Sequence, residues 1–147
     1  MNNRLVLEII GPELAALILR ISLGTVLLMH SLYLKLMVFT LAGTAEFFQS
    51  IGLPGLLAYI VFLIEVVSGI ALILGIQSRL VSALVIPVLL GATWTHWGNG
   101  WLFTNTGGGW EYPLILVSMA LVQINLGNGM YALPTNILNT GHVGVQQ

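Results

Sequence analysis

The sequence contains no cysteine, and charged residues are scarce. The absence of cysteine excludes disulfide bonds, thiolate metal sites and dithiol redox chemistry. Only 6% of the 147 residues are charged and the net charge is −1, whereas soluble domains carry about 25% charged residues. Because no basic cluster exists either, nucleic acid has no electrostatic attachment point. So few charges cannot cover a water-soluble surface, and lipid is the expected solvent.

Hydrophobic residues, in contrast, make up 57% of the chain. Four apolar stretches are long enough to cross a bilayer, which takes about 20 helical residues. They run over about 14–37, 56–74, 80–97 and 111–126. Pro87 lies within the third stretch and should bend it, as membrane helices tolerate. We therefore predict an all-α bundle of four transmembrane helices in one domain, residues 1–131, followed by a loose polar tail, residues 132–147.

Two connections between these stretches are more than simple turns. The first, FTLAGTAEFFQSIGLPG (39–55), is typical of a segment lying in the membrane interface. The second, THWGNGWLFTNTGGGWEYP (95–113), holds three of the four tryptophans and five glycines. Tryptophans gathered at one membrane face are typical of an aromatic belt. The connection also exceeds the usual two to eight residues, and its run of three glycines allows close backbone approach, so we predict a lid over the bundle mouth.

The few positive charges predict an orientation. With four spans, the N-terminus, the 75–79 turn and the C-terminus share one side, which carries Arg4 and Arg79 with Arg20 just inside. The other side has only Lys35. The positive-inside rule then places both termini in the cytoplasm and the 95–113 segment outside. A cleaved signal peptide is the alternative for the N-terminus, but its apolar run would be too long and interrupted by charge.

Several polar side chains fall within the predicted spans. Ionisable groups there cost about 2.5–3.5 kcal/mol each on insertion, so they normally face the bundle interior and pair. At 100° per residue, each helix carries one stripe of polar or small residues. The stripes are Arg20, Gly24, Ser31 and Lys35; Ala58, Glu65, Ser68, Gly69 and Leu72; Ser82, Leu89, Ala92 and His96; and Glu111, Ser118 and Asn125. We expect the four stripes to meet in one core.

Glu65 is the central residue of this expected core. The helical rise places it near the midplane, within reach of Arg20 from one side and His30 from the other. We favour an Arg20–Glu65 ion pair, because a permanently charged guanidinium could keep a buried carboxylate ionised. Lys35 would then extend to the interface. The ion pair either fixes helix register alone or lets Glu65 take part in proton or quinone chemistry.

His30 and His96 are both predicted in the outer half of the bundle, on different helices. They could form hydrogen bonds, transfer protons, or serve as structural side chains. They could also ligate a b-type haem or, with Glu111 or Glu46, a metal ion. The sequence has neither an HxxxH spacing nor a cysteine, so no motif in it requires a haem or a metal ion. We therefore assign no metal-ligating residue and leave haem and metal open.

The outer mouth of the bundle is the predicted binding site. A flat, aromatic-walled pocket beside lipid suits a quinone, and a buried carboxylate or imidazole can titrate near neutral pH to relay the accompanying protons. The predicted catalytic residues are Glu65, His96 and Glu111. The predicted cofactor-binding residues are Arg20, His30, Asn99, Trp97, Trp101 and Trp110, the three tryptophans forming the wall of the pocket.

These segments resemble the DoxX/DoxD family of small four-helix membrane proteins over roughly residues 14–133. LILRISLGTVLLMHSLYLK is similar to the family's first helix. FFQSIGLPG, IEVVSGIALILGIQSR and HWGNGWLFTNTGGGWEYPL are similar to the segments that follow. Many members have histidine-glycine with a lysine four residues on. Here Ser31 replaces that glycine and Lys35 follows His30 by five residues, so the resemblance carries no joint His–Lys role to this chain.

The resemblance implies a subunit of a quinone-associated oxidoreductase in a bacterial inner membrane, because DoxD-like members are similar to the membrane subunit of a thiosulfate:quinone oxidoreductase. It implies part of an enzyme rather than a complete one, with a partner subunit or a homo-oligomer. Two other classes stay open. One is an assembly or stabilising subunit that docks partner helices on small-residue faces. The other is a small-solute carrier with Glu65 as its binding carboxylate.

Overall fold

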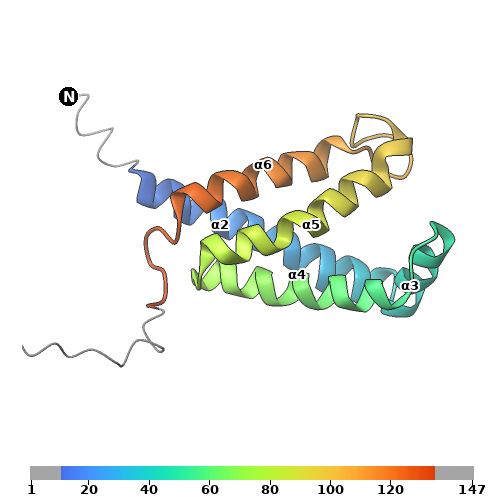
Figure 1. Cartoon of the computed structure of the whole chain (residues 1–147), viewed down its shortest axis with the longest axis horizontal. Helices are drawn as coiled ribbons and strands as arrows, with labels where there is room; N and C mark the ends of the chain where they lie inside the picture. The colour runs from blue at the N-terminus through green and yellow to red at the C-terminus, as the bar shows by residue number, and fades with distance from the viewer. Residues whose placement is uncertain (1–10, 135–147) are drawn as a thin grey trace, which may run out of the picture.

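The computed structural model describes residues 11–134, which form five helices and no strand (Figure 1). In chain order these are α2 (Pro12–Leu28) continued by the π-helix η1 (Met29–Val38), α3 (Leu41–Ser50), α4 (Leu56–Leu74), α5 (Ser78–His96) continued by the 3₁₀ turn η2 (Trp97–Asn99), and α6 (Glu111–Leu126). The all-α prediction is confirmed, and the second and fourth predicted stretches have the observed bounds. Arg4 and the predicted tail beyond residue 134 lie outside the described residues.

Local sequence accounts for the helix ends. Pro12 opens α2 in its first turn, where its missing N–H is no loss. Thr40 caps α3 by accepting a hydrogen bond from the Gly43 N–H through its hydroxyl. Gly75 ends α4 in the left-handed conformation with φ of 73°, which only glycine adopts without strain. Local turn chemistry therefore sets the starts of α2 and α3 and the end of α4.

The helices pack as two antiparallel pairs, α2 with α4 and α5 with α6 (Figure 1). In the first pair the backbones touch, since a Cβ on Gly24 would lie 2.8 Å from the Gly69 carbonyl oxygen. Small residues permit such close approach of membrane helices. The two pairs lie close at the end where α2 begins and α6 ends, which we call the terminal end, and diverge toward α3 and the loop 97–110, which we call the loop end (Figure 1).

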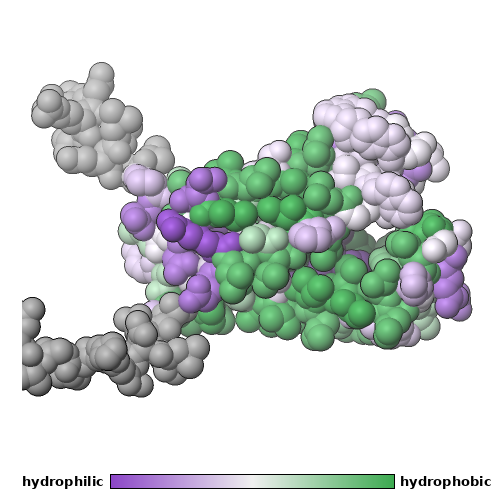
Figure 2. Space-filling view, in the orientation of Figure 1, coloured by the Kyte–Doolittle hydropathy of each residue, from purple (hydrophilic) through white to green (hydrophobic). Residues whose placement is uncertain are grey.

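The outside of the bundle is apolar along its length. Figure 2 shows a hydrophobic band between a hydrophilic terminal end and a more polar loop end. Three helices have the length and composition to cross a membrane, over Pro12–Val38, Leu56–Leu74 and Ser78–Asn99. The fourth, α6, is apolar but has 16 residues, about 24 Å at the α-helical rise. The chain is therefore a membrane protein, and a crossing by α6 stays a prediction.

The predicted inward stripes are correct for three helices and wrong for the fourth. Arg20, Gly24 and Ser31 are buried, as are the stripe residues of α4 and, on α5, Ser82 and Leu89. On α6, Ser118 and Asn125 are exposed. Each donates to the carbonyl four residues back on its own helix, so neither needs the core to satisfy its polar group. The buried face of α6 is Pro113, Leu116, Val117, Ala120 and Gln123.

Candidate functional site

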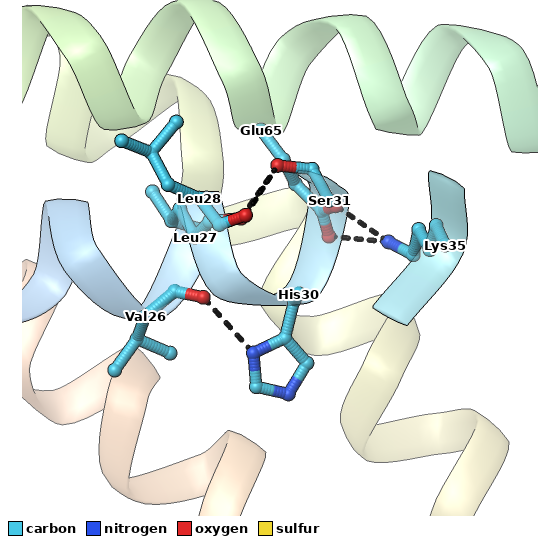
Figure 3. A network of polar contacts seen from close by, with 7 residues as sticks. All are labelled: Val26, Leu27, Leu28, His30, Ser31, Lys35 and Glu65. Atoms are coloured by element: carbon cyan, nitrogen blue, oxygen red, sulfur yellow. Dashed lines mark hydrogen bonds and ion pairs between the residues drawn. The ribbon is translucent and has the colours of Figure 1, made fainter. Parts of the chain in front are cut away.

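Glu65 is buried on α4, 6% exposed, and its partner is Lys35 (Figure 3). The Lys35 Nζ lies 2.5 Å from Oε1 and 2.6 Å from Oε2. This corrects the predicted Arg20–Glu65 pair and the prediction that Lys35 extends to the interface. Side chains on a helix lean toward its N-terminus. Because α2–η1 and α4 are antiparallel, Lys35 and Glu65 lean toward each other, whereas Arg20 leans away from Glu65.

Arg20 instead binds backbone carbonyls at the terminal end. It is 1% exposed. Its Nη1 donates to the carbonyls of Leu72, at 2.9 Å, and Ile73, at 2.5 Å, and its Nη2 donates to that of Met130, at 2.8 Å. The last carbonyls of a helix have no partner within it and carry the negative end of the helix dipole. Arg20 therefore ties α2 to the end of α4 and to the segment after α6.

A cavity of about 480 Å³ opens between the two helix pairs at the loop end. The surface is hollowed there, beside the loop 97–110 (Figure 2). Its volume falls within the roughly 300–1,000 Å³ of small-molecule sites. The residues that line it are Val26, Leu27, His30, Glu65, Val88, Leu89, Ala92, His96, Phe103, Gly108, Gly109, Tyr112, Pro113 and Leu116. The structure thus brings together Glu65, His30 and His96 from three different helices, but not Arg20.

Both histidines of the cavity are anchored through Nδ1. The His30 Nδ1 lies 3.0 Å from the Val26 carbonyl oxygen, one turn back on the same helix (Figure 3). The His96 Nδ1 lies 3.0 Å from the carbonyl oxygen of Gly107 and 3.1 Å from that of Gly108. The His30 ring also stacks on Tyr112 with their centroids 5.9 Å apart. Both imidazole rings are therefore held in place by contacts within the protein.

The loop 97–110 is built on its own hydrogen bonds. Asn99 Nδ2 donates to the carbonyls of Gly107 and Gly108 at 3.1 and 2.9 Å. Glu111 accepts from the Phe103 N–H at 3.3 Å. Gly107 and Gly108 have φ of 82° and 76°, which favours glycine at both positions. Asn99 and Glu111 therefore hold the loop rather than line the cavity, and the loop supplies Phe103, Gly108 and Gly109 to the lining, as a lid would.

The tryptophans do not wall this cavity. Trp97 stacks on Trp110 at 4.6 Å between centroids, and Trp101 meets Trp110 edge-on at 4.4 Å. Trp97 is 61% exposed. Both rings pack on Trp110 instead, and the aromatic rings in the cavity lining besides the histidines are those of Phe103 and Tyr112. The predicted role of the tryptophans in ligand binding stays a prediction.

Sequence reasoning missed Tyr112 and Lys35 as residues of the site. The apolar spacing of Pro113, Leu116, Val117 and Ala120 follows the helical repeat and could have identified the inner face of α6. That face would have brought the first turn of α6, with Tyr112, to the cavity. Among residues 11–134, no group of three or more histidine, aspartate or glutamate side chains is placed to hold a metal ion.

Comparison with known proteins identifies the family. The DoxX family model matches residues 15–97, a shorter range than the predicted resemblance. A protein of Bacillus subtilis (strain 168) named "Putative oxidoreductase CatD" is 36% identical over 80 residues. That match covers 54% of this chain and 58% of the relative, less than two thirds of its length. No solved structure matches the chain. With more than half of its sequence matched by the family model, this membrane protein belongs to the DoxX family.

Proposed function

We propose that this chain is the membrane subunit of a quinone-associated oxidoreductase and that its cavity receives the quinone ring. The observation that carries the proposal is the composition of the cavity, whose mostly apolar wall includes His30, Glu65 and His96. Its volume suits a small ligand, and Phe103 and Tyr112 offer aromatic faces to a flat ring. The name of the Bacillus subtilis relative supports oxidoreductase chemistry.

A quinone, when bound, supplies a two-electron couple whose reduction takes up two protons. In the proposed site, His30 and His96 orient the ring oxygens through the Nε2 atoms that their backbone contacts leave free. Glu65 supplies a carboxylate whose position is fixed by Lys35. The aliphatic lining excludes water. Glu111 and Asn99 act by positioning the loop 97–110 and hence His96.

Electron delivery is assigned to a partner redox subunit. Thiosulfate, if it is the donor, would be oxidised on that partner, because no lysine or arginine is among the described residues lining the cavity. An anion gains little from such a lining. We further propose a bacterial inner membrane with the terminal end in the cytoplasm. The exposed Arg79 at that end supports this orientation, since Lys35, toward the loop end, is neutralised by Glu65.

Ligand binding tests the proposal directly. Equilibrium dialysis of the detergent-purified protein against short-chain ubiquinone and menaquinone analogues should show saturable binding. Ala92 lines the cavity, so Ala92→Phe should fill it and weaken binding at least about tenfold, or 1.4 kcal/mol. Ala83 is exposed on the same helix, and Ala83→Phe is the matched control. Absence of saturable binding to the wild-type protein, or equal binding by Ala92→Phe, rejects the proposal.

A second candidate function is that of an assembly subunit of a larger membrane complex. Gly24 and Gly69 are used within the α2–α4 contact, but Ala83, Pro87 and Gly91 form an exposed small-residue face on α5. Such faces let membrane helices associate. A protein that binds no quinone, but loses a co-purifying complex on Gly91→Leu, would favour this function. A solute carrier with Glu65 as its binding carboxylate is less favoured, since Lys35 already binds both Glu65 oxygens.

A further inference from the structure

The hydrogen-bond partners of the two cavity histidines fix their tautomers. A carbonyl oxygen can only accept a hydrogen bond, and both Nδ1 atoms lie 3.0 Å from one. Each Nδ1 must therefore carry the hydrogen, which leaves Nε2 of the neutral imidazole as a lone pair that accepts. In Figure 3 the second ring nitrogen of His30 points away from both the Val26 carbonyl and the Glu65–Lys35 pair. In the neutral imidazole of each residue, Nε2 is therefore the nitrogen that accepts a hydrogen bond.

The remaining lining adds few donors. Glu65 is a carboxylate held by the Lys35 ammonium, so it too accepts. The Gly108 N–H already donates to the Asn105 carbonyl at 2.8 Å and Pro113 has no N–H, whereas the Gly109 N–H, also in the lining, makes no hydrogen bond to the described residues. Apart from His30, His96 and Glu65, the only polar side chain among the lining residues is that of Tyr112, which has a hydroxyl. The polar side chains of the cavity therefore present more acceptors than donors, which favours a ligand that brings its own donors.

We propose that the cavity selects the reduced form of its quinone, the hydroquinone with two ring hydroxyls, over the oxidised form. This inference rests on the proposed function and adds to it which redox state is preferred. The oxidised ring presents two carbonyl oxygens, which would face imidazole lone pairs with no hydrogen between them. The reduced ring presents two O–H donors, which both Nε2 atoms can accept. Gaining this pair of hydrogen bonds corresponds to about tenfold tighter binding.

The preference has a redox consequence by linkage. A site that binds the two-electron-reduced form tenfold more tightly raises the midpoint potential of the bound couple by about 30 mV. Reduction of a quinone held at this site would therefore be more favourable than reduction of free quinone in the bilayer. His30 and His96 are thus specificity-determining residues in this proposal, since they act by touching the ligand oxygens.

The wild-type protein with three forms of one short-chain ubiquinone provides the test. The oxidised quinone, the hydroquinone and the dimethyl ether of the hydroquinone are each titrated under anaerobic conditions by equilibrium dialysis. The hydroquinone should bind about tenfold more tightly than the quinone. The ether keeps the reduced ring but has no O–H, so it should bind no more tightly than the quinone. Equal binding of the three forms, or tighter binding of the quinone, overturns this inference and leaves the proposed function standing. Binding of none of them overturns both.

Substitution of the acceptors gives a second test. His30→Phe and His96→Phe keep a flat ring but remove one acceptor each, so each should lower the hydroquinone-to-quinone preference, and the double variant should abolish it. Ser118→Ala, on the exposed side of α6, should keep the full preference. A preference that survives the double variant would refute the role of the histidines. Should these variants fail to fold, the ether comparison on wild-type protein still decides.

Discussion

Lys35 and Glu65 form a two-contact ion pair between η1 and α4, with Nζ 2.5 and 2.6 Å from the two carboxylate oxygens. The pair joins the helices at the edge of the cavity that Glu65 lines. It forms because the two side chains lean toward each other from antiparallel helices. The same contact therefore links η1 to α4 and fixes the position of the Glu65 carboxyl group in the site.

Removal of Lys35 should be costly unless Glu65 is changed with it. Lys35→Met leaves a buried carboxylate without its partner and should lower the free energy of unfolding by about 3 kcal/mol. The double variant Lys35→Met/Glu65→Met removes both charges and should recover most of that loss. Denaturant unfolding in detergent micelles measures both. An equal loss in the single and double variants would show that the charge pairing is not what matters.

Arg20→Lys should weaken the terminal end of the bundle. A guanidinium reaches three carbonyls on two segments, whereas an ammonium is a single point that cannot span them. We expect a loss of about 2 kcal/mol in unfolding free energy and no change in quinone affinity. Arg79→Lys, at an exposed position, is the matched control and should be neutral. A neutral Arg20→Lys would contradict the carbonyl contacts.

The close contact between α2 and α4 should not tolerate an added methyl group at Gly69. A Cβ on Gly69 would lie 2.8 Å from Leu28 Cγ and 3.0 Å from the Gly24 carbonyl oxygen, so Gly69→Ala should cost about 1–3 kcal/mol of stability. Gly91 is also within a helix but has nothing within 4 Å of its Cβ position. Gly91→Ala should therefore be neutral or stabilising by up to about 1 kcal/mol. Thermal unfolding of the two variants side by side makes the comparison.

Gly109 should be required for the shape of the loop 97–110. A Cβ there would collide with the carbonyl oxygens of Gly100, Trp101 and Leu102. Gly109→Ala should displace the loop and reduce quinone binding at least about tenfold, with little change in overall stability. Gly98→Ala, whose Cβ would meet nothing within 4 Å, is the control. Undiminished quinone binding by Gly109→Ala would show that the loop does not shape the cavity.

The proposed membrane orientation can be tested by labelling single introduced cysteines, because the natural sequence has no cysteine. Thr104 is exposed at the loop end and Glu13 at the terminal end. In intact spheroplasts, a membrane-impermeant maleimide should label Thr104→Cys at once and Glu13→Cys only after the membrane is permeabilised. The reverse pattern would show that the orientation is opposite to the proposed one. Labelling of both variants in intact spheroplasts would show that Glu13, at the terminal end, does not face the cytoplasm.

Much of the fold follows from local properties of the sequence. The bounds of α4 and α6 coincide with apolar runs closed by Gly75 and Gly127, and the buried face of α4 follows from helical periodicity alone. The helical spacing of polar residues predicted the wrong buried face for α6, because Ser118 and Asn125 donate hydrogen bonds to carbonyls of their own helix. A polar side chain in a membrane helix has to face the bundle interior only if it cannot form its hydrogen bond with a backbone carbonyl of its own helix.

The site was predicted less completely, because its partners are distant in sequence. The sequence identifies Glu65, His30 and His96 as polar groups that hydrocarbon forces inward, and the structure places all three on one cavity. It does not identify Lys35 as the partner of Glu65, since that choice depends on the direction in which side chains lean on two antiparallel helices. Nor does it place Trp97 and Trp101 against Trp110, away from the cavity lining.

The sequence by itself determined that this chain is helical, is embedded in a membrane and has polar side chains facing the bundle interior. It could do so because the length of a hydrophobic run and the helical repeat are properties of residues that are close in sequence. Only the tertiary structure decided which charges pair, which aromatic rings face the cavity and which nitrogen of His96 is free. Those outcomes depend on contacts between residues 11 to 30 positions apart, such as His96 with Gly107 and Lys35 with Glu65, and such contacts exist only once the helices have packed.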